Sequence, residues 1–212
     1  MRFEHGPLKT WPAPSRSAYR NRVQLHYDQK LLGMKRQNQI VSTPQCHLPE
    51  KKIQETISEF FKNDSWKNKV PSKTGHIEFC LTNEDSVAVE YNKAYAHQGF
   101  EQVNREMNRT LQEIVQNYCL DHGPILDLFG GSGNLTALCS AKTYVMDLPK
   151  NNKMEGEHQK YHSVDLYAED SLAKVKKIVP EASVVIVDPP RSGFKELQDW
   201  VELYRPKQII YV

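Results

Sequence analysis

The stretch that decides the fold is ILDLFGGSGN, residues 125–134, together with VVIVDPPR, residues 184–191. Each is an apolar run that leads to an acidic residue and then to a sharp turn. This is the pattern of a buried parallel strand that delivers side chains to the carboxyl edge of a sheet. Asp127 and Asp188 stand 61 residues apart. Because ligands of open α/β sheets bind at that edge, the pair predicts a nucleotide-like ligand with chemistry beside it.

The pattern of strands and helices changes near residue 98. Residues 1–98 predict a small α+β domain, and residues 99–212 predict alternating strands and helices, which indicate a parallel, doubly wound sheet. The expected elements are short strands within 18–43, a helix over 50–62, a hairpin of 77–81 and 86–91, a helix over 103–118, a strand before the glycine-rich loop and a helix after it, strands at 143–147 and 161–165, a helix near 170–178, a strand at 183–188, a helix near 194–204 and a strand at 208–212.

Charge is distributed unevenly along the 212 residues, although the formal net charge is only +2. Residues 1–75 hold 14 Lys and Arg against 6 Asp and Glu, and residues 76–212 hold 14 against 20. A basic half joined to an acidic half predicts that the first half meets a polyanion. A basic surface without any partner produces the same composition, so charge alone leaves both interpretations open.

Composition excludes several classes of protein. No apolar run approaches the roughly 20 residues of a membrane span, and residues 1–17 lack the apolar centre of a secretory signal. The four cysteines have no CxxC spacing, so neither a zinc site nor a disulfide framework is indicated. We therefore expect a cytoplasmic protein that does not contact a membrane.

The turn after the first strand contains Gly130, Gly131 and Gly133, and glycines let a ligand approach the backbone because no Cβ intervenes. The loop reads GGSG and not GxGxxG, so it matches a pyrophosphate site poorly, and a tight turn alone also explains it. Asp147 ends the next expected strand 20 residues after Asp127, about where an acidic side chain reaches ribose hydroxyls. Asp127 stands where a carboxylate can face a cation. A cofactor with ribose, adenine and a positive charge, but no phosphate, fits best; S-adenosylmethionine is that molecule.

The second turn is Asp188-Pro189-Pro190-Arg191. Pro189 favours an extended backbone at Asp188 and removes a ladder donor, so the segment is at least a rigid strand end. A rigid turn also holds a carboxylate and a guanidinium over the ligand site, where preorganised charge contributes most. Its position beyond the glycine-rich turn favours this functional interpretation.

Four blocks of the chain resemble, in order, the S-adenosylmethionine-dependent RNA uracil-C5 methyltransferases, which make 5-methyluridine in 23S ribosomal RNA and in transfer RNA. The first and third blocks also arise by chance, whereas all four in order are specific and cover nearly all of the chain. Gly130 departs from the family's DLFCGxGN, in which a Cys is usual. The blocks are Tyr19-Arg20-Asn21-Arg22 with Gln24-Leu25-His26 and Leu32-Gly33-Met34-Lys35, Gly99-Phe100-Glu101-Gln102-Val103-Asn104 with Asn108, Asp127 to Asn134, and Asp188 to Gly193.

This resemblance implies an incomplete Rossmann-like class I methyltransferase domain, preceded by a smaller RNA-facing region. Tyr19, Arg20, Arg22 and Arg191 match RNA-binding positions, in agreement with the basic first half. Asp147 replaces the commoner Glu and retains the carboxylate. The positions implied to surround S-adenosylmethionine or the target base are Gln102, Phe129, Gly131, Asn134, Asp147, Asp165 and Asp188.

The family's chemistry requires a Cys thiolate that adds to uracil C6, so that C5 becomes able to attack the sulfonium methyl group. A general base then removes the C5 proton. The resemblance places this Cys in a Ser-Cys-Asn-Pro segment after the strand that matches Ile209 to Val212. We therefore expect the nucleophile beyond Val212, no catalytic residue within this chain and no methyl transfer by it. None of the four cysteines of this chain, at 46, 80, 119 and 139, replaces the nucleophile by position.

Cys46 resembles one ligand of an iron–sulfur cluster that many relatives carry. A cluster needs about four thiolates, so we expect one only if a full-length protein supplies the others. The chain is interpreted as a piece truncated at both ends, with a degenerate relative as the alternative.

The expected partner is therefore 23S ribosomal RNA or transfer RNA, and the expected oligomeric state is a monomer. Two alternative functions remain. One is a non-catalytic RNA-binding relative of the family. The other is a nucleic-acid methyltransferase that acts on an amine; Arg191 speaks against its DPPY-type turn.

Overall fold

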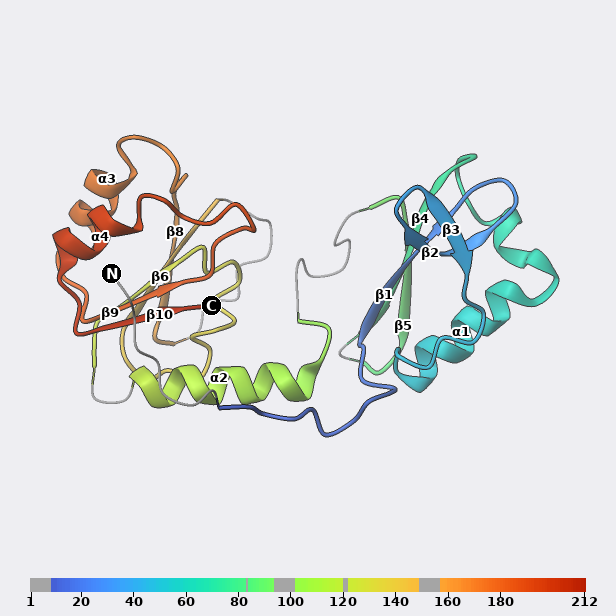
Figure 1. Cartoon of the computed structure of the whole chain (residues 1–212), viewed down its shortest axis with the longest axis horizontal. Coiled ribbons are helices and arrows are strands. Elements are labelled where there is room, and N and C mark those ends of the chain that lie inside the picture. The colour runs from blue at the N-terminus through green and yellow to red at the C-terminus, as the bar shows by residue number, and fades with distance from the viewer. Residues whose placement is uncertain (1–8, 83, 94–101, 120–121, 149–156) are drawn as a thin grey trace. The chain divides into compact units, whose positions relative to one another are not determined.

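The computed structural model describes residues 9–82, 84–93, 102–119, 122–148 and 157–212, which form two compact units (Figure 1). The first unit contains the described residues before 94 together with Val103–Met107. The second contains Gln102 and the described part of Asn108–Val212. The predicted domain boundary near residue 98 lies outside the described residues.

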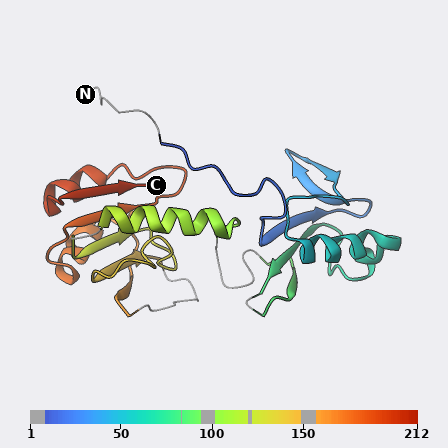
Figure 2. The same cartoon turned by 90° about the horizontal axis from the view of Figure 1, so that it is seen from below.

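The first unit is an antiparallel five-stranded sheet in the order β3-β2-β1-β4-β5, with helix α1 on one face (Figures 1 and 2). Val23, Leu25 and Tyr27 alternate along β1 and pack against Ile53 and Ile57 of α1. The predicted short strands, helix and hairpin are confirmed. The elements are β1 (Arg22–Tyr27), β2 (Leu32–Arg36), β3 (Gln39–Ser42), α1 (Lys51–Phe61), the 3-10 helix η1 (Lys62–Asn68), β4 (Gly75–Leu81) and β5 (Val87–Tyr91).

The second unit is a parallel five-stranded sheet in the order β10-β9-β6-β7-β8. The chain enters this sheet at the central strand β6 and continues outward to β7 and β8. It then crosses back to form β9 and β10 on the other side of β6. This is the doubly wound, Rossmann-like arrangement, and it confirms the predicted fold class. The elements are α2 (Arg105–Cys119), β6 (Ile125–Leu128), β7 (Thr143–Asp147), β8 (Gln159–Ser163), α3 (Ser171–Ile178), β9 (Val184–Val187), α4 (Leu197–Tyr204) and β10 (Gln208–Tyr211).

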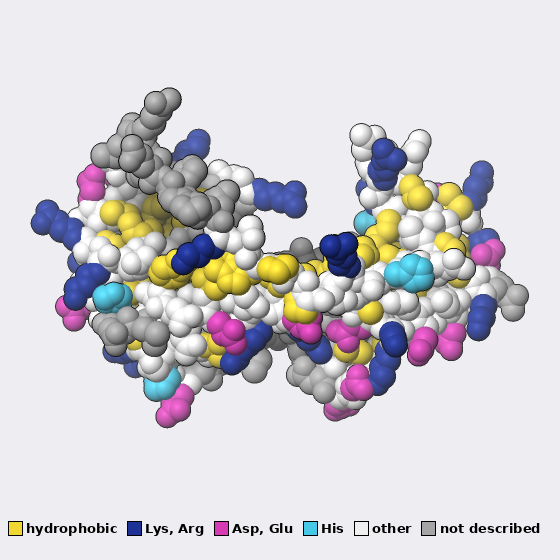
Figure 3. Space-filling model, turned by 60° about the horizontal axis from the view of Figure 1, so that its bottom comes forward, with side chains coloured by type: hydrophobic (Ala, Val, Ile, Leu, Met, Phe, Trp, Pro, Cys, Tyr) yellow, Lys and Arg dark blue, Asp and Glu magenta, His cyan; other side chains and the backbone are white. Residues whose placement is uncertain are grey.

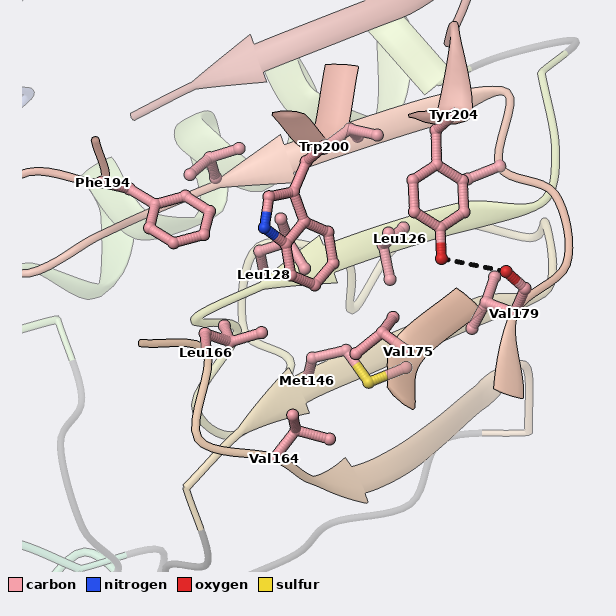
Figure 4. Packing of buried hydrophobic residues seen from close by; sticks show 13 residues of the cluster. Leu126, Leu128, Met146, Val164, Leu166, Val175, Val179, Phe194, Trp200 and Tyr204 are labelled. Carbon is pink, nitrogen blue, oxygen red and sulfur yellow. Dashed lines mark hydrogen bonds between the residues drawn. The ribbon is translucent and has the colours of Figure 1, made fainter. Parts of the chain in front are cut away.

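Apolar side chains attach α3 and α4 to one face of this sheet and α2 to the other (Figures 2 and 4). Leu126 and Leu128 of β6 meet Val175 of α3 and Trp200 of α4. The intervening side chains of a strand point the opposite way, and Ile125 accordingly packs with the α2 cluster. The same alternation directs Asp127, which lies between the two leucines, toward the α2 face.

The helix predicted after the glycine-rich loop is wrong, because residues 131–138 form successive turns. Thr136 N–H donates to the Gly133 carbonyl and Cys139 N–H to the Thr136 carbonyl, so these bonds span three residues, not the four of an α-helix. Only residues 134–142 connect the loop at the carboxyl edge to the amino end of β7. Such a short return leaves little room for a regular helix.

The strand predicted at 161–165 lies two residues earlier, at Gln159–Ser163. It pairs in parallel with β7, from Thr143 opposite Gln159 to Asp147 opposite Ser163. Val164 and Leu166 gave the segment a strand-like apolar pattern, but they follow the strand and enter the core beside α3.

Candidate functional site

The site lies where the order of the parallel strands reverses. After β6 the chain continues to β7 on one side, and after β8 it crosses to β9 on the other side. Strands β6 and β9 are hydrogen-bonded neighbours, with Leu128 opposite Val187. Their loops diverge at the carboxyl edge, and such a switch point is where open α/β sheets bind ligands. Asp127 in β6, Asp147 at the end of β7 and Asp188 after β9 all lie at this edge.

Asp127 is completely buried. Its Oδ2 accepts a hydrogen bond from Thr136 Oγ1 at 3.1 Å, and its Oδ1 has no hydrogen-bond partner among the described residues. Burial raises the pKa of Asp127 to about 7; the Thr136 hydrogen bond opposes this shift, and the charges of Asp188 and Asp147 add to it. Burial also raises the pKa of Asp188 above its ordinary value. The site therefore holds an acidic side chain that changes charge near neutral pH.

Asp147 is fixed by backbone amides and is half-buried. Gly131 N–H donates to its Oδ2 at 2.8 Å and Leu148 N–H to its Oδ1 at 2.7 Å. Each carboxylate oxygen can accept a further hydrogen bond. Gly131 has φ of 57°, and a Cβ there meets nothing nearer than Asp147 Oδ2 at 3.8 Å. The loop thus leaves open space beside a rigidly held carboxylate.

Gly130 is required by packing. A Cβ at this position would lie 2.6 Å from Val145 Cγ1 and 2.7 Å from the Asp127 carboxyl group, distances that side chains do not tolerate. The departure from the family's usual Cys therefore coincides with a loop that lies directly against Asp127.

Two side chains that the motifs did not indicate hold the loop in place. Gln159 Nε2 donates to the Gly133 carbonyl at 2.8 Å and to Thr136 Oγ1 at 2.9 Å, and Tyr161 Oη donates to the Ser132 carbonyl at 2.6 Å. Gln159 and Tyr161 face the same side of β8 because they are two residues apart. The predicted strand began at residue 161, which left Gln159 outside it. The spacing of two residues between Gln159 and Tyr161 was the available sequence signal that both side chains face the same side of one strand.

Asn134 connects the loop to α2. Its side chain forms a reciprocal amide pair with Asn108, with N–O distances of 2.9 and 2.8 Å. Gln112 Nε2 also donates to the carbonyl and Oδ1 of Asn134. This contact set makes Asn134 a positioning residue for the loop. Gln102, which precedes α2, is half-buried.

Aromatic rings join three loops at the same edge. Phe129 has φ of 62°, a left-handed conformation that is costly for a residue with a side chain. Its ring lies 4.9 Å from that of Phe194 and 5.4 Å from that of Tyr167. The Tyr167 hydroxyl donates to the Gly193 carbonyl at 3.0 Å. Tyr167 is about half exposed and was not among the predicted site residues, because no motif or spacing pointed to it.

The other predicted residues of this unit are exposed. Asp165 follows β8, and its Oδ1 accepts a hydrogen bond from Tyr167 N–H at 3.0 Å. Arg191 lies in the loop after β9 with its side chain in solvent. Both are accessible to a ligand at the carboxyl edge.

Arg22 in the first unit was predicted to bind RNA, and the structure corrects this prediction because the residue is buried. It is 7% exposed, and its Nε lies 3.2 Å from Oε1 of Glu78, which is 3% exposed. Its Nη2 also donates to Cys80 Sγ at 3.6 Å. A guanidinium held in this way inside the protein is not available to a phosphate group.

Tyr19 and Arg20, the other predicted RNA-binding residues of this unit, are half-buried. The Arg20 guanidinium lies 6.0 Å from the centre of the Tyr19 ring. On the face drawn in Figure 3, Lys and Arg side chains are spread over the surface and do not gather in one patch.

None of the four cysteines stands at the carboxyl edge. Cys80 lies in β4, and Cys46 is half-buried in the first unit. Cys119 and Cys139 line one cavity with Gly123 and Ala141, residues that precede β6 and β7, so this pair lies toward the amino ends of the strands. A hydrogen bond with Cys139, together with burial, raises the pKa of the Cys119 thiol. In the described part of the chain, no three His, Cys, Asp or Glu residues are arranged to hold a metal ion.

Comparison with known proteins gives relatives in sequence and in structure, although no family model matches. The chain is 33% identical over 125 residues, 53% of its length, to 23S rRNA (uracil(1939)-C(5))-methyltransferase RlmD of Legionella pneumophila (strain Lens), of which the match covers 28%. It is 24% identical over 215 residues, 94% of its length, to an uncharacterised RNA methyltransferase of Nitrosomonas europaea, of which the match covers 54%. The chain thus spans about half the length of these curated relatives or less.

A solved structure shares the fold. It is the Pyrococcus abyssi tRNA (uracil-54, C5)-methyltransferase in complex with S-adenosyl-L-homocysteine. The TM-score is 0.65 at 16% sequence identity, and the match covers 94% of this chain and 67% of that one.

The strand order gives the second unit a doubly wound, Rossmann-like fold, which the solved methyltransferase structure shares, and the first unit is an antiparallel α+β unit. In sequence the chain is similar to a 23S rRNA uracil-C5 methyltransferase and to an RNA methyltransferase, which agrees with the resemblance of its four motif blocks. No helix that the structure describes has the length and apolar character to cross a membrane.

Proposed function

We propose that the second unit binds S-adenosylmethionine and that the protein to which this chain belongs transfers its methyl group to uracil C5 in 23S ribosomal RNA or transfer RNA. The observation that carries this proposal is the arrangement at the switch point. A loop without side chains at Gly130 and Gly131 runs between two acidic strand ends, and the relatives' names supply the reaction and the class of substrate. The proposal includes a cytoplasmic location, where these RNA substrates are found. It also includes a monomeric state.

The residues of the site fit such a cofactor. The half-buried Asp147 carboxylate has lone pairs for ribose hydroxyls, and the open space at Gly131 admits a ligand close to the backbone. Asp188, together with Asp127 when it is ionised, gives the edge a negative potential that suits a sulfonium ion, and one buried oxygen of Asp127 has no hydrogen-bond partner among the described residues. The loop lacks the GxGxxG spacing of a pyrophosphate site.

The residues would divide the work as follows. Asp147 would hold the ribose, and the loop fastened by Gln159, Tyr161 and Asn134 would keep the cofactor in one orientation. Asp188, on its rigid turn, would stand beside the reacting groups. Bound S-adenosylmethionine would supply an electrophilic methyl group. The thiol for uracil C6 would have to come from outside these residues, because no cysteine of the chain stands at the carboxyl edge.

Two measurements test the proposal. Titration calorimetry should detect binding of S-adenosylmethionine by the chain, and absence of binding would remove the cofactor assignment. With tritiated S-adenosylmethionine and unmodified ribosomal and transfer RNA, the chain alone should form no 5-methyluridine above background. Losing a nucleophile that acts as part of a unit removes most catalysis, about 10⁶-fold in a well-studied case. Nucleoside digestion that reveals 5-methyluridine would show that a residue of this chain serves as the nucleophile.

A further inference from the structure

Asp127 is a buried acid with an incomplete set of partners. It is completely buried on the α2 face of β6, directly under Gly130. Thr136 Oγ1 donates to one carboxyl oxygen, and the other oxygen has no hydrogen-bond partner in the described part of the chain. An ionised carboxylate is costly in such a position unless a cation or further donors compensate it.

The groups that face Asp127 raise this cost. Asp147 from β7 and Asp188 from the loop after β9 act on it with charges of the same sign. The thiols of Cys119 on α2 and Cys139 in the turn segment lie within its electrostatic reach. An acid beside other carboxylates retains its proton to higher pH, and a cation brought near it reverses that effect.

We propose that Asp127 makes the site selective for a cationic cofactor by ionising when the sulfonium ion of S-adenosylmethionine binds and by staying protonated when the uncharged thioether of S-adenosylhomocysteine binds. The inference rests on the proposed function and extends it to the discrimination of cofactor from product. The balance is simple: binding of the cation releases one proton from the Asp127 carboxyl group to solvent, and no covalent bond to carbon changes. The two ligands share adenosine, the amino group and the carboxylate, so their difference isolates the methyl group and its positive charge on sulfur.

A pH dependence follows from linkage. Below neutral pH the free chain holds the proton that the bound state must release, so affinity for S-adenosylmethionine should fall by at most about tenfold per pH unit. Above pH 8 Asp127 is ionised before binding, and the affinity should level off. Affinity for S-adenosylhomocysteine should stay nearly constant over this range, so the preference for the charged cofactor should appear as the pH rises.

The test is titration calorimetry of both ligands between pH 5.5 and 8.5, in buffers that differ in ionisation enthalpy. S-adenosylmethionine should release up to one proton near pH 6.5 and S-adenosylhomocysteine close to none. Asp127→Asn should abolish the difference in proton release. The comparison of wild type with Asp127→Asn also subtracts the titration of each ligand's own amino group, because that titration contributes equally to the measurements on both proteins.

A second variant keeps the inference testable if Asp127→Asn does not fold. Thr136→Val retains the acid but removes the hydrogen bond that lowers its pKa, so the pH at which proton release is half-maximal should move upward. Equal proton release by both ligands, or an unchanged midpoint in Thr136→Val, overturns the inference while leaving cofactor binding intact. Failure of both ligands to bind wild-type protein overturns the proposed function and the inference with it.

Discussion

Each unit of the molecule buries an ionisable residue in a sheet, and the surroundings of the two residues differ. One is paired with an opposite charge, whereas the other lies among groups of like charge. Arg22 in the antiparallel sheet faces Glu78 at 3.2 Å, and both are almost without exposure. Among the described residues, Asp127 in the parallel sheet has a single hydroxyl donor on one oxygen, and two further carboxylates act on it. A buried ion pair of opposite charges has a structural role, whereas an acid placed beside other acids is prepared for a ligand cation. The contrast supports our proposal that the functional site lies in the second unit.

The largest effect should come from breaking the buried Arg22–Glu78 ion pair. Arg22→Ala leaves Glu78 buried without its partner and should lower the free energy of unfolding by about 3–5 kcal/mol. Urea unfolding measures the loss, and hydrogen exchange in β1 and β4 should assign it to the first unit. Arg22→Met combined with Glu78→Leu is the matched control, since replacing both charges with apolar groups is often close to neutral. A loss below about 1 kcal/mol for Arg22→Ala would mean that solvent reaches the pair.

The uncompensated acid should show itself in the pH dependence of stability. The folded-state pKa of Asp127 is raised from 3.8 to about 7, so between these values the unfolded chain loses the proton that the folded chain retains. The contribution of Asp127 to stability is therefore full below pH 4, falls as the pH rises to 7, and stays low above. The slope is at most about 1.4 kcal/mol per pH unit. Asp127→Asn should remove this fall, and parallel stability curves for variant and wild type would contradict it.

A smaller effect is expected at Asp147, the half-buried carboxylate of the site. Asp147→Ala should weaken S-adenosylmethionine binding by about 1–3 kcal/mol, because a charged hydrogen-bond partner is lost. Titration calorimetry provides the measurement. Asp199→Ala, which removes an exposed carboxylate on α4, is the matched control and should leave binding unchanged. Unchanged affinity in Asp147→Ala would remove this residue from the site.

Elements with a clear period could be predicted from the sequence almost to the residue. The strand expected at 143–147 is β7, Thr143–Asp147, and the helix expected near 170–178 is α3, Ser171–Ile178. The helix expected after the glycine-rich loop failed because the length of the connection, and not a hydrophobic period, determines that segment. The edge strand β8 was displaced by two residues because its polar residues face the loop while the apolar residues after it face the core.

The site was partly predictable for a related reason. Acidic residues that end parallel strands must meet at one edge, so Asp127, Asp147 and Asp188 could be placed together before the structure was known. The environment of a charge was not predictable. Arg22 and Arg20 are equivalent in the basic segment, and only the pairing of β1 with β4 brings Glu78 next to Arg22.

This difference between the two arginines gives the smallest expected effect. If the first unit contacts RNA, the logarithm of affinity should fall with the logarithm of salt concentration, and each lost phosphate contact flattens the slope by about 0.7 for single-stranded RNA. Arg20→Ala should produce such a change without loss of stability, since Arg20 is only half-buried and has no ion pair among the described contacts. Binding measured over a range of salt concentrations tests this expectation.

The matched control is Lys62→Ala, which removes an exposed positive charge that follows α1 in the same unit. It should leave the slope unchanged if the contact is specific to Arg20. Equal changes in both variants would indicate attraction by the net charge of the first unit, and salt-independent binding would remove the RNA contact from this unit. Arg22→Ala cannot make this distinction. It leaves Glu78 buried without its partner and destabilises the sheet, so a change in RNA affinity would not report on a direct contact.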